Sequence, residues 1–532
     1  MDINVPVILE KEDFTYKKLL LPFISGLLTS LGFYSTHFDF LIWFSLVPLF
    51  YCLFNYKISA KKGFLITFVY SITFYLGLLT WLFKLHPLTW VGFTEIQSLG
   101  IITLGWISFS LVESLSLSIL GFLYGLVKPE GWKNILFVSS LWVIIEALQG
   151  FSDSGFTWGR LAISQYKEIY LIQSSNLFGS LFISFILILL NSSIALSLVD
   201  YFKNKDKKSF KYTYPVLILI VINLFYGFYT VFSKEDNGKE INTVIIQGNI
   251  LSDQKWNMTV QQGIDIYLDL SKQALNDNKK EKIDLFVWPE SAVRTTMENP
   301  SVMAQLKDFT FKNDTFLLTG IFDVLRKKDP NDYDVFNAMT GISPKGEVLG
   351  KYYKRHLVPF GEYLPFKDIL FAIYPPIKEI NRLGKDITPG KSSNVFKMPF
   401  GHVGGLICYE SIFPELIRES TTDGAEILIL VTNDSWYKDS SAVYHHNGQA
   451  VFRSIENDRY MVRAANTGIS SFISPTGQTI EMLGPLLKGY IKDKVKLRNT
   501  KTLYTIIGDT VVIFAIILLF ISSFKSKKTQ EE

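Results

Sequence analysis

One cysteine lies among residue types that suit covalent catalysis. Cys408 follows a short apolar run and is followed directly by Tyr409 and Glu410. The chain has one other cysteine, Cys52, in an apolar run near the N-terminus. Two cysteines exclude a disulfide framework and a multi-cysteine zinc site. A free cysteine is usually a small buried hydrophobe, so a structural thiol is the alternative to a nucleophile.

Its position in the sequence favours the nucleophile. The segment "HVGGLICYE" (402–410) reads as a buried strand that ends near Cys408. The following "SIFPELIRES" is expected to open a helix, and a helix N-terminus lowers the pKa of a nearby thiol. If the domain faces an oxidising compartment, an unpaired thiol without a function is also a liability. We therefore expect Cys408 to be reactive.

A nucleophile needs a general base and a group that stabilises the oxyanion. In "VWPESAV", Glu290 stands at a strand end beside apolar residues, where partial desolvation favours a carboxylate that takes up a proton. The segment 351–365, "KYYKRHLVPFGEYLP", supplies Lys354 and Glu362. A buried lysine offers a fixed positive charge to a developing oxyanion. Each fragment alone is weak, because an isolated Trp-Pro-Glu is usually structural.

The elements that would position these residues alternate between strands and helices. Five segments read as buried strands, and "TVQQGIDIYLDLSKQALND" (259–277) reads as a helix between two of them. This alternation predicts an α/β domain. Chemistry gathers at the carboxyl ends of strands in such sheets, where Glu290, Cys408 and Asn433–Asp434 all fall. The five strand segments are 243–250, 283–291, 315–322, 402–410 and 425–434.

Composition places this domain next to a membrane. Hydrophobic residues make up 48% of the 532 residues and aromatic residues 15%, and the mean hydropathy is +0.22. A soluble protein is rarely that apolar. The net charge of +4 is too small to indicate a nucleic-acid partner. The adjacent pair His445 and His446 would not share one face, so no metal and no cofactor is expected.

Apolar runs of near-spanning length predict eight membrane helices. The run at 134–148 is the shortest, and the two longest are expected to begin as interfacial segments. We expect seven helices in residues 1–240, a polar catalytic domain in 241–498, and a closing helix with its tail in 499–532. The runs are 19–35, 38–54, 63–83, 95–127, 134–148, 169–199, 214–232 and 503–524.

Lysine and arginine positions predict the orientation. Alternate loops and the two ends carry sixteen of these residues, and the opposite short loops carry three. Basic residues favour the cytoplasmic side, so both termini are expected in the cytoplasm and the polar domain outside. Glu10, Glu12 and Asp13 precede the first apolar run, which differs from the basic start of a cleavable signal peptide. We therefore expect the first helix to be an uncleaved anchor.

Taken together and in order, the motifs resemble the nitrilase superfamily and, with the membrane helices, the apolipoprotein N-acyltransferases of bacterial inner membranes. The family usually has proline at the position of Thr157 and often phenylalanine at that of Tyr437, so these departures concern local loop shape. The resemblance rests on "GFTWGRLAISQ" (155–165), "QGNI…KW" (247–256), "WPES" (288–291), "K…LVPFGEYLP" (354–365), "CYESIFPE" (408–415), "NDSWY" (433–437) and "RAANTGIS" (463–470).

The resemblance implies an α/β nitrilase-like α-β-β-α sandwich inserted before the last helix of an eight-helix transmembrane domain. It implies transfer of an acyl chain from a phospholipid to the α-amino group of the lipid-modified N-terminal cysteine of an apolipoprotein, in a periplasmic domain of a multi-pass inner-membrane protein. The carried-over roles are Glu290 as base, Lys354 as oxyanion stabiliser and Cys408 as nucleophile. Glu362, Tyr409 and Glu410 match supporting positions, and Trp256 and Trp436 match aromatic positions near the substrate entrance.

Two other functions remain as alternatives. A membrane-tethered amidase would use the same three residues but would leave the helices and the "GFTWGR" loop without a purpose. A catalytically dead scaffold would be expected to lack at least one of the three.

Several further residues have open roles: Trp158 as interfacial anchor or lipid contact, Glu146 as loop-packing group or functional carboxylate, Glu113 and Asp509 as interhelical hydrogen-bonding or functional groups, and Arg453, Arg459 and Arg463 as structural ion-pair partners.

Overall fold

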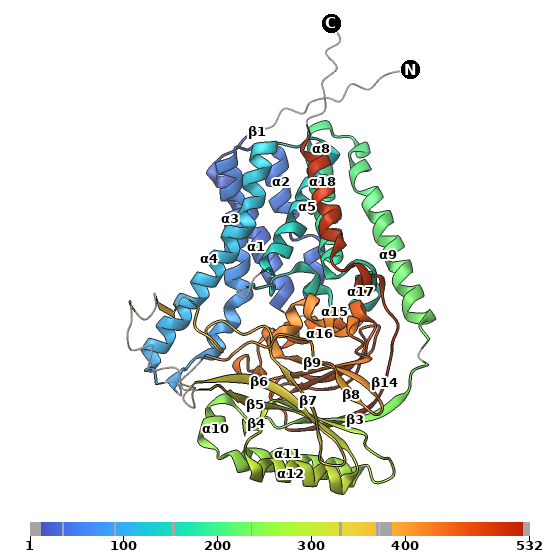
Figure 1. Cartoon of the computed structure of the whole chain (residues 1–532). Coiled ribbons are helices and arrows are strands. Elements are labelled where there is room, and N and C mark those ends of the chain that lie inside the picture. The colour runs from blue at the N-terminus through green and yellow to red at the C-terminus, as the bar shows by residue number, and fades with distance from the viewer. Residues whose placement is uncertain are drawn as a thin grey trace.

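The structure is a computed structural model, and it describes residues 12–34, 37–89, 92–151, 155–235, 237–328, 332–365, 367–368, 372 and 386–524. A bundle of helices lies at one end and a layered α/β domain at the other (Figure 1). The end of α18 (Thr510–Ser523) and the short strand β1 (Glu12–Asp13) both lie at the bundle end away from the sheets.

The expected apolar runs form helices, and several of the runs are divided into shorter helical segments. The run at 169–199 is divided into two short helices and one long one, whereas the run at 95–127 forms a single helix of 33 residues, α4. The helices of the bundle are α1 (Leu20–Tyr34), α2 (Val47–Asn55), α3 (Ala60–Leu78), α4 (Glu95–Val127), α5 (Trp132–Gln149), α6 (Ile169–Ile172), α7 (Ser175–Phe178), α8 (Ser180–Asn204), α9 (Tyr214–Ser233), α17 (Leu503–Ile507) and α18, and β2 (Tyr56–Lys57) pairs with β1.

Four helical segments of the described chain are long and apolar enough to cross a membrane. Two shorter segments, Asp39–Asn55 and Thr510–Ser523, are also apolar. The predicted number of eight spanning helices therefore stays a prediction. The four long segments are Ala60–Leu85, Glu95–Val127, Ser180–Asn204 and Lys207–Ser233.

Small residues bring α3 and α4 together. A Cβ atom on Gly63 would lie 1.9 Å from the carbonyl oxygen of Gly121, so glycine is needed at this crossing. The Ser71 hydroxyl donates to the Ser114 carbonyl across the two helices at 3.2 Å. Lipid offers no hydrophobic driving force between helices, and close backbone approach and interhelical hydrogen bonds take its place.

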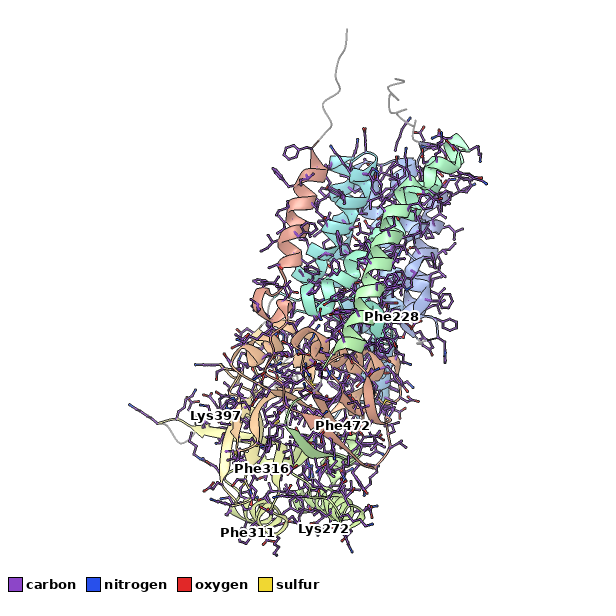
Figure 2. All side chains as sticks on the ribbon, turned by 90° about the vertical axis from the view of Figure 1, so that its right-hand side faces the viewer. Phe228, Lys272, Phe311, Phe316, Lys397 and Phe472 are labelled. Carbon is purple, nitrogen blue, oxygen red and sulfur yellow. The ribbon has the colours of Figure 1, made fainter. Side chains whose placement is uncertain are left out.

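The polar domain has four layers. One six-stranded sheet has the order β14-β3-β4-β5-β6-β7, and the other β13-β12-β11-β10-β9-β8. The first sheet packs on α11 and α12 at the far end, and the second on α15 and α16 next to the bundle (Figure 1). Figure 2 shows Lys272 of α11 and Phe311 of α12 at the far end, and Phe472 nearer the bundle.

The five expected strands and the expected helix at 259–277 correspond to β3, β4, β5, β9, β10 and α11, whereas the other strands of the two sheets were not predicted. Apolar side chains from both sheets meet between them, among them Ile245, Val287, Ile407 and Ile429. The strands are β3 (Glu240–Gln247), β4 (Leu285–Thr296), β5 (Phe316–Arg326), β6 (Tyr333–Ile342), β7 (Val348–Tyr353), β8 (Phe396–Met398), β9 (Gly401–Ile407), β10 (Ile427–Thr432), β11 (Met461–Ala465), β12 (Ser470–Ile473), β13 (Thr479–Leu483) and β14 (Gly489–Lys496), and the helices α10 (Ser252–Asn257), α11 (Val260–Asp277), α12 (Pro300–Asn313), α15 (Pro414–Thr422) and α16 (Ser441–Asn457).

Candidate active site

Glu290, Lys354 and Cys408 come together between the ends of strands from both sheets. Glu290 lies in β4, Lys354 follows β7, and Cys408 follows β9. All three side chains are buried. The Lys354 ammonium lies 3.5 Å from a Glu290 oxygen, and both charges act on the Cys408 thiol. The three residues predicted from separate fragments thus form one group.

Local backbone geometry presents Glu290 and Cys408 to this group. Cys408 has φ +54°, and Ser291, directly after Glu290, has φ +51°. The pairing of β4 with β5 shifts register between Trp288 and Val293, so Glu290 sits in an irregular stretch of the strand. Gly320 of β5 leaves room for it, because a Cβ there would lie 2.6 Å from the Glu290 Cα. Such strained positions are common at functional sites.

Lys354 is surrounded by carboxylates. Glu362 pairs with its ammonium at 2.9 Å and accepts the Val358 N–H at 2.8 Å. Burial lowers the pKa of Lys354, but the carboxylates of Glu362 and Glu290 outweigh that effect and the net pKa is raised. Lys354 is therefore a permanent cation, as an oxyanion stabiliser requires.

The pKa of the Cys408 thiol differs from the expectation. Burial, followed by the Glu290 carboxylate, raises the pKa of Cys408, and Lys354 only partly opposes them. The predicted lowering by a helix N-terminus is wrong, because Cys408 begins a 3-10 turn that ends at Ile412, and α15 starts only at Pro414. The thiol therefore keeps its proton until a base removes it.

Glu410 and Tyr409 have different supporting contacts. Glu410 accepts the backbone N–H groups of Ile407 and Arg355, both at 2.7 Å, and the Tyr352 hydroxyl at 2.8 Å. It therefore joins the end of β9 to the segment that carries Lys354. The Tyr409 hydroxyl donates to the Gly155 carbonyl at 3.0 Å and so reaches the membrane part of the chain.

The loop 155–165 of the membrane part covers the site. Thr157 donates to the Ile412 carbonyl at 3.0 Å, a contact that a proline at this position could not make. Trp158 is buried, and its ring centroid lies 5.6 Å from that of Tyr437 and 5.4 Å from that of Trp81. Trp158 is thus part of an aromatic cluster with Trp81 and Tyr437 rather than an exposed interfacial anchor.

Other residues with open roles have mainly structural contacts. Glu146 accepts the Leu161 N–H at 2.9 Å and so fixes the loop 155–165. Arg453 pairs with Glu456 at 2.8 Å, and Arg463 with Asp434 at 2.7 Å. Arg459 donates instead to backbone carbonyls, including that of Ala425 at 2.6 Å. Trp436 is 37% exposed, and the Trp256 side chain lies outside the described part of the structure.

The sequence analysis missed Asn337. Its side-chain amide donates to Glu290 at 2.7 Å and to Glu362 at 2.8 Å, so it joins the two carboxylates. The signal was an asparagine within the otherwise apolar stretch "VFNAM" of β6. A buried amide in such a stretch needs hydrogen-bond partners, and here these are the carboxylates of the site.

Removing this amide should lower both the stability of the fold and the reactivity of Cys408. In Asn337→Ala, we expect the free energy of unfolding to fall by about 1–3 kcal/mol, because buried acceptors lose their donor. Denaturant unfolding measures the change in stability. The rate at which a covalent adduct forms on Cys408 measures the change in reactivity. Asn276→Ala, on the exposed face of α11, is the matched control. Unchanged stability and rate in Asn337→Ala would show that the bridge is dispensable.

Comparison with known proteins decides the family. The profile described as carbon-nitrogen hydrolase matches residues 244–503, and that of the apolipoprotein N-acyltransferase N-terminal domain matches 25–193. An apolipoprotein N-acyltransferase of Geobacter metallireducens is 30% identical over 92% of this chain and 91% of its own. The chain belongs to the apolipoprotein N-acyltransferase family. The Borreliella burgdorferi apolipoprotein N-acyltransferase is also 30% identical, over 94% of each chain.

Solved structures similar to this apolipoprotein N-acyltransferase family member cover about half of the chain. A carbon-nitrogen hydrolase from Helicobacter pylori has 15% identity and a TM-score of 0.37, over 51% of this chain and 95% of its own. An amidase from Nesterenkonia sp. has 17% identity and a TM-score of 0.36, over 53% of this chain and 98% of its own. The nitrilase-like fold itself follows from the carbon-nitrogen hydrolase match and the observed α-β-β-α layers.

Proposed function

We propose that this protein is the membrane enzyme that N-acylates apolipoproteins in the last step of lipoprotein maturation, with Glu290, Lys354 and Cys408 as its catalytic residues. The acyl donor is a phospholipid, and the acceptor is the α-amine of an N-terminal S-diacylglyceryl-cysteine. The observation that carries the proposal is a buried Glu-Lys-Cys group closed by a loop of the membrane part, through Thr157 and Tyr409.

In the first half-reaction, Glu290 takes the proton of the Cys408 thiol, and the sulfur attacks the ester carbonyl of the lipid. The Lys354 ammonium stabilises the oxyanion. The lysophospholipid leaves with the proton that Glu290 returns, and the acyl chain remains as a thioester on Cys408. In the second, the neutral acceptor amine attacks the thioester, and Glu290 takes the amine proton and passes it to the departing Cys408 thiolate, which restores the free thiol.

A tethered amidase would use the same three residues and is the second candidate. The aromatic cluster of Trp81, Trp158 and Tyr437 favours the acyltransferase, because it joins the membrane part to the catalytic group and excludes water from it. The decisive test supplies purified protein with phospholipid and a diacylglyceryl-cysteine peptide. We expect an N-acylated peptide by mass spectrometry. A released fatty acid with unmodified peptide would contradict the proposal.

The proposed location is the inner membrane, with the catalytic domain in the periplasm and both termini in the cytoplasm. The distribution of lysine and arginine supports it. A reporter that is active only outside the cytoplasm should work when fused after Val244 and fail when fused after Lys211, since α9 alone separates these positions. Enzymatic reporters fused in cells provide the measurement. The reverse pattern would overturn the orientation and, with it, the lipoprotein substrate.

A further inference from the structure

A buried histidine contacts the backbone of the catalytic cysteine. His446, on α16, places its Nε2 atom 3.1 Å from the carbonyl oxygen of Cys408. Its other ring nitrogen, Nδ1, lies 2.8 Å from a carboxylate oxygen of Asp434. Arg463 donates to the second Asp434 oxygen at 2.7 Å. The side chains of His446, Asp434 and Arg463 are fully buried, so these contacts are shielded from water.

The partners of the ring determine what it donates. A backbone carbonyl has no hydrogen to give, so Nε2 must carry the proton at Cys408. On the other side of the ring, Nδ1 faces the Asp434 carboxylate, and the Arg463 guanidinium lies 3.1 Å from the same nitrogen. Burial raises the pKa of Asp434, but the charges of Arg463 and His446 outweigh it and keep that pKa low. Asp434 therefore remains an anion that orients the imidazole.

The contact of His446 is with a residue whose backbone conformation is strained. Cys408 has φ +54°, a region that L-residues rarely adopt and that persists only where the surroundings impose it. The Cys408 carbonyl and the Tyr409 N–H belong to one planar trans peptide and point to opposite sides. A hydrogen bond to the carbonyl thus fixes the orientation of that peptide and of the residue that carries the thiol.

We infer that His446, oriented by Asp434 and Arg463, is a positioning residue that holds the Cys408 backbone in its reactive conformation. This inference rests on the proposed function, since it requires Cys408 to be the nucleophile. His446 acts through the Cys408 carbonyl and takes no part in proton transfer with the substrate. The set of His446, Asp434 and Arg463 thus adds to the Glu-Lys-Cys group residues that position the nucleophile.

Two other interpretations of this cluster fit less well. One atom each of Cys408, Asp434 and His446 lies within 4.8 Å of the others, a spacing that would suit a metal ion. However, both ring nitrogens already have protein partners, because Nε2 faces the Cys408 carbonyl, and Nδ1 faces Asp434 and the Arg463 guanidinium. A simple core ion pair would not need Nε2 to contact the nucleophile's own carbonyl. The contact with Cys408 is what distinguishes a positioning role.

Two substitutions at His446 separate its two contacts. The amide nitrogen of asparagine takes the place of Nδ1, whereas that of glutamine takes the place of Nε2. His446→Asn therefore keeps the bond to Asp434 and loses the bond to Cys408, and His446→Gln keeps a donor at Cys408. In His446→Asn, we expect the rate constant for acyl-adduct formation to fall about 10–100-fold, the effect of one lost buried hydrogen bond. The phospholipid concentration for half-maximal rate should not change, and His446→Gln should recover most of the rate.

The measurement is single-turnover adduct formation on the full chain, followed by intact mass over a range of phospholipid concentrations. His445→Gln is the matched control, because His445 is also buried on α16 but its Nε2 contacts the Phe33 carbonyl. It should react at the wild-type rate. Asp434→Asn provides a second variant. We expect a smaller fall in its rate constant for acyl-adduct formation and no change in the phospholipid concentration for half-maximal rate.

Three results would overturn the inference. The first is a wild-type rate in His446→Asn. The second is an equal loss in His446→Asn, His446→Gln and His445→Gln, which would indicate general damage to α16. The third is a rise in the half-maximal phospholipid concentration with no change in the rate constant at saturation. A wild-type chain that forms no adduct would instead refute the proposed function, and this inference would fall with it.

Discussion

Cys408→Ala is expected to form no acyl adduct and no N-acylated peptide, because the variant has lost the sulfur that would accept the acyl chain. Intact mass spectrometry after incubation with phospholipid measures the adduct. The matched control is Cys52→Ala, since Cys52 is a buried thiol of α2 and lies outside the site. This variant should form the adduct as the wild type does. Full transfer activity in Cys408→Ala would refute the assignment of the nucleophile.

Lys354→Ala tests the oxyanion stabiliser in the same assay. Losing one oxyanion donor typically lowers the rate by about 10²–10³-fold, and we expect that loss in adduct formation. The variant also leaves the Glu290 and Glu362 carboxylates without their shared cation, so its thermal unfolding should be measured alongside. A folded variant that forms the adduct at the wild-type rate would exclude this role for Lys354.

The second large effect concerns the fate of the adduct. Without an acceptor, we expect the thioester on Cys408 to persist, because the aromatic cluster and the lipid keep water away. A peptide with a diacylglyceryl-modified N-terminal cysteine should discharge it and become N-acylated. The same peptide with an acetylated α-amine should leave it intact, because its nitrogen no longer has a reactive lone pair. Intact mass over time, with and without each peptide, provides the measurement.

Glu290→Gln should slow both halves of this cycle. Glu290 is the proposed base for the thiol and for the amine, and loss of a general base typically costs about 10²–10⁴-fold in rate. Rapid loss of the wild-type adduct in lipid and detergent alone, unaffected by the free-amine peptide, would contradict the acyltransferase and favour the tethered amidase. If the thioester of a Glu290→Gln variant were discharged by the peptide at the wild-type rate, Glu290 would act as the base only in the acylation of Cys408.

The sequence was most informative where a residue's role depends on its own strand. Glu290 and Cys408 could be placed at strand ends because apolar runs mark β4 and β9, although these strands belong to two different sheets that meet only through their packing. Asn337 was missed because its role depends on two carboxylates that come from β4 and from the segment after β7. The pairing of Arg463 with Asp434 joins residues 29 positions apart in sequence. No local pattern predicts such a contact.

The thiol pKa shows a second limit of sequence reasoning. The pattern after Cys408 indicated a helix, and the helix exists, but it begins only at Pro414. The depth of burial, which dominates the pKa of Cys408, depends on the loop 155–165 and on both sheets at once. The number of membrane helices is likewise not determined by the sequence pattern. The run at 169–199, for example, is divided into α6, α7 and α8, and this division depends on tertiary packing.

The pairing of β14 with β3 also determines when the enzyme can first work during its synthesis. β3 is the first strand of the polar domain and β14 the last, and they pair from Glu240 with Lys496 to Gln247 with Gly489. At about 5–20 residues per second, a ribosome needs roughly 12–50 s to proceed from one to the other. Throughout that interval β3 exposes an unpaired edge, which invites association with other chains. The newly made domain therefore needs protection until its final strand emerges, and a chain interrupted before that point has an open sheet.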